Sequence, residues 1–201
     1  MSTVQLSEKE INQTIIQNVL RMLERRKLIN SWENEYKLLE SDLITKTTFE
    51  VNHNTNKYGI YLVNTKLTTI VKGTPLDQYL LNNINTHKFI IIKDAMKKVV
   101  KQIMQEYKNS EFFFESDFLE DIPSKIFIPK HEIMISEEKA ELLSKYSEAE
   151  LSRILSTDIM CRYYGGKVGD ILKITRPSFS AGYSIFYRKV VNGSLDVLFN
   201  N

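Results

Sequence analysis

The residue types that most often carry chemistry are widely scattered in this sequence of 201 residues. The three histidines are His53, His87 and His131, and the single cysteine is Cys161. These positions do not give the ligand spacing of a structural zinc site, and one cysteine cannot form an internal disulfide. The sequence also lacks a phosphate-binding glycine loop and a serine nucleophile elbow. We therefore expect no catalytic residue, no metal ion and no cofactor.

The triplet Asn64-Thr65-Lys66 is the nearest approach to a nuclease motif, because it follows a predicted strand. Nucleases of that class carry Asp or Glu in the first position, where the carboxylate binds a divalent metal ion. Asparagine lacks that carboxylate, so we expect no independent nuclease activity.

Two basic clusters stand in the first part of the chain. Arg25-Arg26-Lys27 ends the first predicted helix, where cations either complement the helix dipole or contact phosphate. Lys93, Lys97 and Lys101 are spaced by four residues, which places them on one face of another predicted helix. Solvation of that face is the simpler interpretation. In the functional alternative, Lys93, Lys97 and Lys98 contact the phosphates of duplex DNA and supply attraction that falls steeply with salt.

The composition is that of an ordinary folded protein, with 42% hydrophobic and 26% charged residues. It is not that of a disordered, collagenous or fibrous chain. No apolar run approaches the ~20 residues of a membrane helix, and the first residues do not resemble a secretory signal. We therefore expect an intracellular protein with no membrane partner.

The net charge of +2 is unevenly distributed along the chain. Basic and acidic residues balance up to Asp121, whereas basic residues dominate from Arg153 to Lys189. A free-standing nucleic-acid-binding factor would carry a strongly basic face on a dedicated domain. The balance of charge in the first part of the chain argues against that function.

The first 121 residues predict an α/β domain. Ser7 and Glu10 form a capping box at the start of a helix, whose apolar residues recur at spacings of three and four as far as Ile29. Further elements are paired strands at 48–51 and 60–63, a strand at 88–92, a helix from Ala95 to Tyr107, and a strand at 111–115. The order strand, helix, strand predicts a parallel pair.

Residues 122–201 predict a small α+β domain, with a boundary near Asp121. We expect His131 to be packed or hydrogen-bonded, and Cys161 to be buried as a small apolar side chain. The predicted elements are a strand at 126–128, a helix from Ser136, a second helix at 148–155, a helical turn from Asp158 to Gly165, and strands at 171–175 and 184–191.

Short motifs are spread through the sequence from Pro129 onward. They are Pro129-Lys130-His131, Glu137-Glu138-Lys139, Leu142-Leu143, Lys145-Tyr146, Asp158, Arg162-Tyr163, Gly165, Lys167, Gly169, Lys173-Ile174, Arg176-Pro177-Ser178, Ala181-Gly182 and Tyr187-Arg188. In type and spacing they resemble the fifth shared subunit of eukaryotic RNA polymerases I, II and III. The C-terminal half of that protein corresponds to a small subunit of archaeal RNA polymerase. The first domain resembles the family's N-terminal jaw domain through element order and Ala95-Met96-Lys97.

The resemblance implies an α/β jaw domain of nuclease-like topology, without an active site, at 1–121. It implies an assembly domain like the small archaeal protein at 122–201. The archaeal counterpart lacks the jaw domain, so we expect a eukaryotic protein or one from a large DNA virus. The protein would then be found in the nucleus if eukaryotic, or in the virion or infected-cell cytoplasm if viral.

The resemblance also implies a function in transcription, as a non-catalytic subunit of a multisubunit DNA-directed RNA polymerase. Such a subunit docks on the largest subunit, beside neighbouring small subunits, and forms the lower jaw near downstream duplex DNA. The expected partner contacts are Arg162, Lys167, Lys173, Arg176 and Arg188. Arg176 and Arg188 are best suited to bidentate pairing with a carboxylate, and scattered, solvated cations are the alternative. A free-standing nucleic-acid-binding transcription factor and a degenerate nuclease are the alternative functions.

Overall fold

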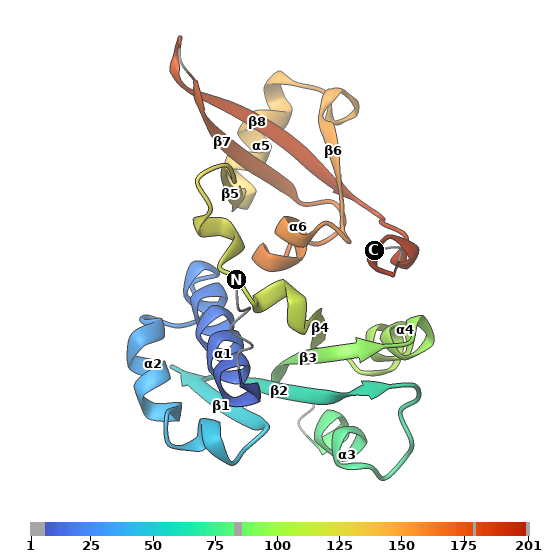
Figure 1. Ribbon diagram of the computed structural model, residues 1–201. Coiled ribbons are helices and arrows are strands. Elements are labelled where there is room, and N and C mark those ends of the chain that lie inside the picture. The colour runs from blue at the N-terminus through green and yellow to red at the C-terminus, as the bar shows by residue number, and fades with distance from the viewer. Residues whose placement is uncertain (1–6, 83–85, 179, 200–201) are drawn as a thin grey trace, which may run out of the picture. The chain divides into compact units, whose positions relative to one another are not determined.

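The computed structural model describes residues 7–82, 86–178 and 180–199 (Figure 1). The chain divides into two compact units, Met1–Glu120 and Asp121–Asn201. Each unit contains its own four-stranded sheet. The fold is therefore of the mixed α+β type, as the sequence predicts.

The first unit is built on a mixed sheet with the strand order β1-β2-β3-β4. Its strands are β1 (Thr48–His53), β2 (Asn56–Leu67), β3 (His87–Ala95) and β4 (Ser110–Phe114). The pair β1/β2 is antiparallel, whereas β2/β3 and β3/β4 are parallel. The predicted pairing of residues 48–51 with 60–63 and the predicted parallel pair are both present.

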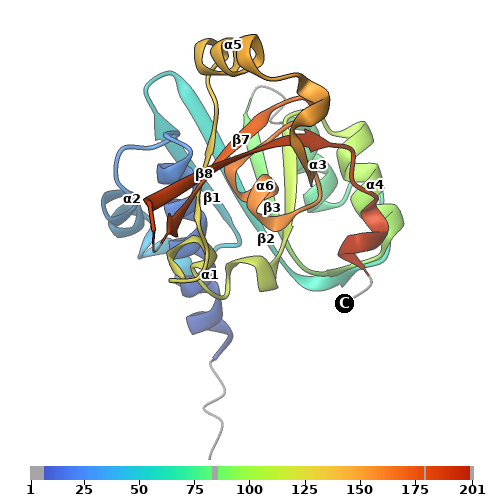
Figure 2. The same cartoon turned by 90° about the horizontal axis from the view of Figure 1, so that it is seen from above.

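Helices cover both faces of this sheet, which explains why residues 88–92 of β3 are all buried. The helices are α1 (Glu8–Arg25), α2 (Trp32–Leu39), α3 (Pro75–Asn82) and α4 (Lys97–Glu106), with short 3-10 helices at Asp42–Ile44 and Glu115–Phe118. Figure 2 shows α1 and α2 to one side of the sheet, and α3 and α4 to the other. Neither α2 nor α3 was predicted from the sequence.

Helix α1 begins where its capping box predicts. The Ser7 side chain accepts a hydrogen bond from the Glu10 backbone N–H, and the Glu10 carboxylate accepts one from the Ser7 backbone N–H. Both bonds satisfy donors that the first helical turn leaves without partners. The buried residues of the helix include Ile15, Val19 and Leu23, as the spacing of its apolar residues predicts.

The predicted helix from Ala95 is wrong at its start. Strand β3 continues to Ala95, because Asp94 and Ala95 still pair with β2, and α4 begins only at Lys97. Lys93 therefore lies in a strand, and it does not share a helix face with Lys97 and Lys101. Sequence spacing of four implies a shared face only within one continuous helix.

The second unit has a sheet with the strand order β5-β7-β8-β6. Its strands are β5 (Lys130–Ile133), β6 (Ser152–Leu155), β7 (Ile171–Ser178) and β8 (Gly182–Val191), and its helices are α5 (Ser136–Lys145) and α6 (Ile159–Tyr164). Short 3-10 helices lie at Ile122–Ser124, Glu148–Glu150 and Leu195–Leu198. The pairs β5/β7 and β7/β8 are antiparallel, and β6/β8 is parallel.

Helix α6 is set by the residues at its two ends. The Asp158 side chain accepts hydrogen bonds from the backbone N–H groups of Met160 and Cys161, and Gly165 ends the helix at φ 74°. Only glycine adopts that left-handed conformation without steric cost. Cys161 thereby enters the core of the unit, which also contains Ile154, Leu172, Ile174 and Val190.

Two predicted elements of the second unit are wrong. Residues 126–128 form a turn rather than a strand, with Ile126 fully exposed and Phe127 74% exposed. Residues 148–155 are a 3-10 turn followed by β6, not a helix. Parallel pairing with β8 buries Ile154 in the core, and this tertiary contact overrides the local helical preference.

Among the described residues, we found no helix that combines the length and the apolar character required to cross a bilayer.

Candidate functional site

The strand register of the second unit places Arg176 and Arg188 on the same face of its sheet. Arg188 lies directly opposite Leu172 across the β7/β8 pair, and Arg176 lies four residues after Leu172 in β7. Side chains two or four positions apart share one face of a strand. Because Leu172 packs in the core with Cys161 of α6, this is the face that α6 covers. We call the outer part of it, formed by Arg176, Phe186 and Arg188, the arginine face.

Phe186 lies on β8, opposite Ile174 of β7. Along the arginine face it stands between Arg176 of β7 and Arg188 of β8. The guanidinium of Arg176 lies over the Phe186 ring, 5.1 Å from its centroid. Phe186 is nevertheless 47% exposed. A guanidinium over an aromatic ring is held by the cation–π attraction, while its N–H donors stay accessible to a carboxylate. The arginine face therefore combines an exposed aromatic ring with the cationic donors of Arg176 and Arg188.

His131 is packed at the inner margin of the arginine face. The Nδ1 atom donates a hydrogen bond to the Pro129 carbonyl at 2.7 Å, and the ring stacks on Tyr164 with centroids 6.4 Å apart. Burial lowers the pKa of His131, and the charges of Arg188 and Arg176 add to that effect. The Pro129 hydrogen bond and the Asp158 charge oppose it. The prediction of a packed, hydrogen-bonded histidine is confirmed.

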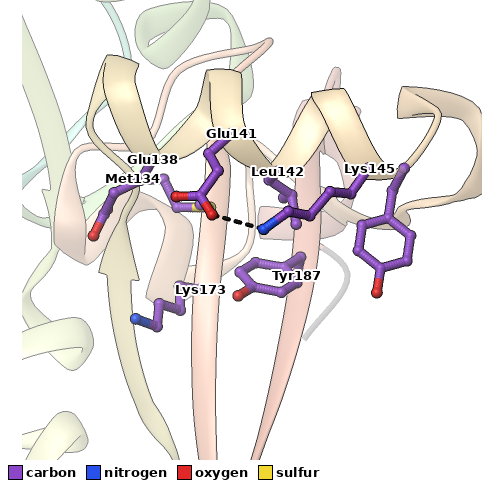
Figure 3. A pocket seen from close by; sticks show the side chains of 8 residues that line it. Met134, Glu138, Glu141, Leu142, Lys145, Lys173 and Tyr187 are labelled. Atoms are coloured by element: carbon purple, nitrogen blue, oxygen red, sulfur yellow. Dashed lines mark hydrogen bonds and ion pairs between the residues drawn. The ribbon is translucent and has the colours of Figure 1, made fainter.

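Lys173 lies on the opposite face of the sheet from the two arginines. It pairs with Tyr187 of β8 and Glu132 of β5, and it faces α5. Lys173 and Tyr187 line a pocket of about 370 Å³ beneath α5 (Figure 3). The other lining residues are Met134, Glu138, Glu141, Leu142, Lys145 and Tyr146. The structure thus separates Lys173 from the arginine face.

Arg162 and Lys167 come from elements that precede β7. Arg162 belongs to α6, on the same side of the sheet as the arginine face. Lys167 is exposed in the following loop, where its backbone N–H donates to the Asp170 carboxylate at 2.7 Å. The five cations predicted as partner contacts therefore occupy two faces of the sheet and one loop, rather than one surface.

Cys161 is completely buried, as predicted. Burial raises the pKa of its thiol to about 11, and the charges of Asp158 and Asp170 contribute. A cysteine in this environment stays a neutral thiol near pH 7.

In the first unit, the three predicted DNA contacts lie at the junction between β3 and α4. Lys93 is the seventh residue of β3, and Lys97 and Lys98 open the first turn of α4. All three are exposed. The first turn of α4 contains no acidic residue, although negative charge is the favoured kind at a helix N-terminus. This junction is a cationic surface segment.

The Asn64-Thr65-Lys66 triplet lies in β2. The Lys66 ammonium is paired with the Asp94 carboxylate of β3 at 2.6 Å, and the Asn64 amide donates to Glu8 at 3.0 Å. Within the described residues, no group of three or more metal-ligating side chains is assembled here or elsewhere.

The second unit is similar to a known family of proteins. Residues 120–190 match the family model described as RNA polymerase Rpb5, C-terminal domain. DNA-directed RNA polymerase subunit Rpo5 of Archaeoglobus fulgidus is 44% identical over 68 residues, which are 33% of this chain and 90% of that protein. The chain belongs to the Rpb5 family.

Longer members of the Rpb5 family match most of the chain. DNA-directed RNA polymerases I, II, and III subunit rpabc1 of Dictyostelium discoideum is 28% identical over 188 residues, covering 88% of this chain and 95% of that protein. DNA-directed RNA polymerase subunit 5 of Acanthamoeba polyphaga mimivirus is 27% identical over 187 residues, covering 88% and 90%. These matches confirm the resemblance found in the sequence.

Proposed function

We propose that this chain is a non-catalytic subunit of a multisubunit DNA-directed RNA polymerase, active in transcription. It docks on the largest subunit through residues 122–201 and forms the lower jaw near downstream DNA with residues 1–121. The observation that carries the proposal is membership of the Rpb5 family, whose relatives are named as polymerase subunits. The same relatives support an intracellular protein that is nuclear or viral.

The arginine face supports a docking function. It exposes an aromatic side chain, Phe186, beside Arg176 and Arg188, and aromatic residues and arginine are enriched at protein interfaces. Arg176 and Arg188 would pair with carboxylates of the largest subunit or its small neighbours, since the guanidinium fork matches a carboxylate. Arg162, Lys167 and Lys173 would make further contacts from the neighbouring elements.

The surroundings of Lys66 and Cys161 support a non-catalytic function for this chain. Lys66, the lysine of the nuclease-like triplet, is paired with Asp94. The Cys161 thiol is buried, with its pKa raised to about 11. Neither group is prepared for nucleophilic attack or metal binding.

Affinity purification of the tagged, full-length chain from cells that contain its polymerase tests this function. We expect the two largest polymerase subunits to be recovered in amounts equal to the chain. Recovery of the chain alone would exclude the proposal. Recovery of nucleic acid without polymerase subunits would favour the alternative of a free-standing binding factor.

A further inference from the structure

The β7–β8 hairpin extends beyond both of the strands that flank it in the sheet (Figure 1). Strand β5 pairs with β7 only as far as Thr175, and β6 pairs with β8 only from Arg188 onward. Residues 182–187 of β8 therefore have a strand on one side only, among the residues that the structure describes. A strand edge of this kind presents backbone donors and acceptors that are able to pair with another chain.

Hydrogen bonds near the end of β8 establish which backbone groups face the open edge. The Val190 N–H donates to the Asp170 carbonyl on the β7 side, whereas the Val191 carbonyl accepts from Ser156 on the β6 side. Successive residues of a strand direct their backbone groups to opposite edges. By this alternation, the N–H and C=O of Ile185 and the N–H of Tyr187 point to the open edge.

The outer edge of β7 is different, because a proline blocks it. The Ile171 carbonyl accepts from the Met134 N–H of the segment that follows β5, so alternate residues from Ile171 onward face that edge. Pro177 falls on this series, and proline has no backbone N–H to donate. Proline on an edge strand prevents pairing with a further strand. Of the two hairpin edges, only that of β8 is suited to receive one.

The side chains along the open edge are apolar on both faces of the ribbon. Tyr183 and Ile185 project on the face of Lys173, and Phe186 projects on the arginine face. Tyr183 is 70% exposed and Ile185 is 49% exposed. A strand added here would bury apolar side chains on both of its faces, which is the main stabilisation of a cross-strand pair.

The charge of the hairpin selects the chemistry of the added strand. Between Ile171 and Val191 the chain carries only basic charged residues, namely Lys173, Arg176, Arg188 and Lys189. A carboxylate-bearing segment would be attracted to this hairpin. A second copy of the same hairpin is equally basic, so electrostatic repulsion disfavours its approach.

We propose that the open edge of β8, residues 183–187, binds an extended, carboxylate-bearing segment of a neighbouring polymerase subunit as an additional β-strand. The added strand continues the line of β6 on the outer side of β8. Main-chain hydrogen bonds supply the affinity, and the apolar and arginine side chains supply the specificity. This inference rests on the proposed function and specifies how the docking surface works.

The substitution Ile185→Pro tests the strand directly. It removes the outward N–H of Ile185 while leaving the β7/β8 bonds in place, since Ile185 does not donate toward β7. The control Ile185→Ala removes more of the side chain but keeps the N–H. In affinity purification of the full-length chain, we expect Ile185→Pro to reduce the recovery of polymerase subunits at least tenfold, and Ile185→Ala to reduce it less than threefold. Equal recovery with both variants would overturn the proposal.

Amide hydrogen exchange provides a measurement that needs no variant and is independent of any effect of proline on folding. We expect the Ile185 and Tyr187 amides to exchange at least tenfold more slowly in the assembled polymerase than in the purified chain. Unchanged exchange in the assembled enzyme would overturn the proposal. The proposal would also be overturned if the purified chain sedimented as a dimer in which these two amides were as protected as in the assembled polymerase.

The two proposals fail in different ways. If the wild-type chain recovers no polymerase subunit, the proposed function itself is wrong. If the wild-type chain and Ile185→Pro recover the same amount, and the exchange is unchanged, the function stands and the strand addition is wrong.

Discussion

Arg26 shows how one side chain fixes the end of α1 on the sheet. Its guanidinium donates two hydrogen bonds to the Glu111 carboxylate of β4, at 2.9 and 2.8 Å, and it lies over the Phe89 ring at 5.4 Å. The Arg26 side chain is only 6% exposed. It is therefore unavailable to nucleic acid, which excludes the phosphate contact considered from the sequence for this residue.

Glu111 is held ionised by this arrangement. Burial alone would raise the pKa of Glu111, but the hydrogen bond from His87 and the charge and hydrogen bonds of Arg26 outweigh burial. Together they lower the pKa to about 2, from the usual 4.5. A carboxylate with a lowered folded-state pKa stabilises the fold above its unfolded-state pKa. That stabilisation is lost as the pH falls from about 4.5 toward 2.

We predict that Glu111→Gln lowers the free energy of unfolding by about 2 kcal/mol at pH 7, because it leaves the Arg26 charge buried without a counter-charge. Urea denaturation of the full-length chain measures the change. The difference from wild type should shrink as the pH falls from 4.5 toward 2. As a control, Glu141→Gln removes an exposed pair with Lys145 on α5 and should cost less than about 0.5 kcal/mol. Equal effects of the two variants would contradict the prediction.

The junction between strand β3 and helix α4 carries three exposed lysines, Lys93, Lys97 and Lys98. Lys97 and Lys98 stand at a helix N-terminus, where a cation is disfavoured by the helix dipole. Contact with DNA phosphate would offset that cost.

We predict that charge reversal of Lys93, Lys97 and Lys98 to Glu weakens the retention of downstream DNA by the assembled polymerase. For each phosphate that is no longer neutralised, the negative slope of log affinity against log salt should become shallower by about 0.9. Filter binding of assembled enzyme across a salt series measures this slope. Lys57→Glu, on an exposed residue of β2, should leave the slope unchanged. An unchanged slope in the triple variant would show that these lysines are solvated surface residues.

The elements that the sequence predicts well are those with strong local signals. The Ser7 capping box, the Asp158 cap and the Gly165 terminus each depend on hydrogen bonds or backbone angles within a few residues. Residues 126–128 form a local turn, in which the Ile128 N–H donates to the Lys125 carbonyl, although their apolar side chains predict a strand. Residues 148–155 were misassigned because their conformation depends on a distant partner. In β6, for example, Ile154 is buried by pairing with Val190, and no local pattern reveals that partner.

At the scale of the whole molecule, the sequence identifies the family and the residue types of the candidate site, but not their arrangement. It assigns Lys173, Arg176 and Arg188 to one docking surface, whereas the structure places Lys173 on the opposite face of the sheet from the two arginines. Lys173 and Arg176 lie three positions apart in β7, so strand alternation places them on opposite faces, but the predicted strand ends at Thr175. Arg188 joins the face of Arg176 through the β7/β8 register, which the sequence does not reveal. The exposed edge of β8 was also missed, because it depends on where β6 begins, and the sequence predicts a helix there.

We predict that Arg176→Glu combined with Arg188→Glu reduces the recovery of polymerase subunits by the full-length chain at least tenfold, because two cations of the arginine face become negative charges opposite the partner's carboxylates. Lys173→Glu, on the α5 face, serves as the matched change and should have a smaller effect. Quantitative mass spectrometry of the affinity-purified material gives the comparison. A larger loss with Lys173→Glu would move the docking surface to the pocket beneath α5.

Pro177 has a further consequence for how the protein behaves before it is assembled. A β-hairpin whose two edges can both pair with further strands is able to add copies of itself repeatedly, and chains of that kind form fibres. Here Pro177 blocks strand pairing at the outer edge of β7, and the edge of β8 can accept one additional strand. Excess copies of the chain that are not assembled would therefore remain separate molecules, each with its β8 edge available to a partner.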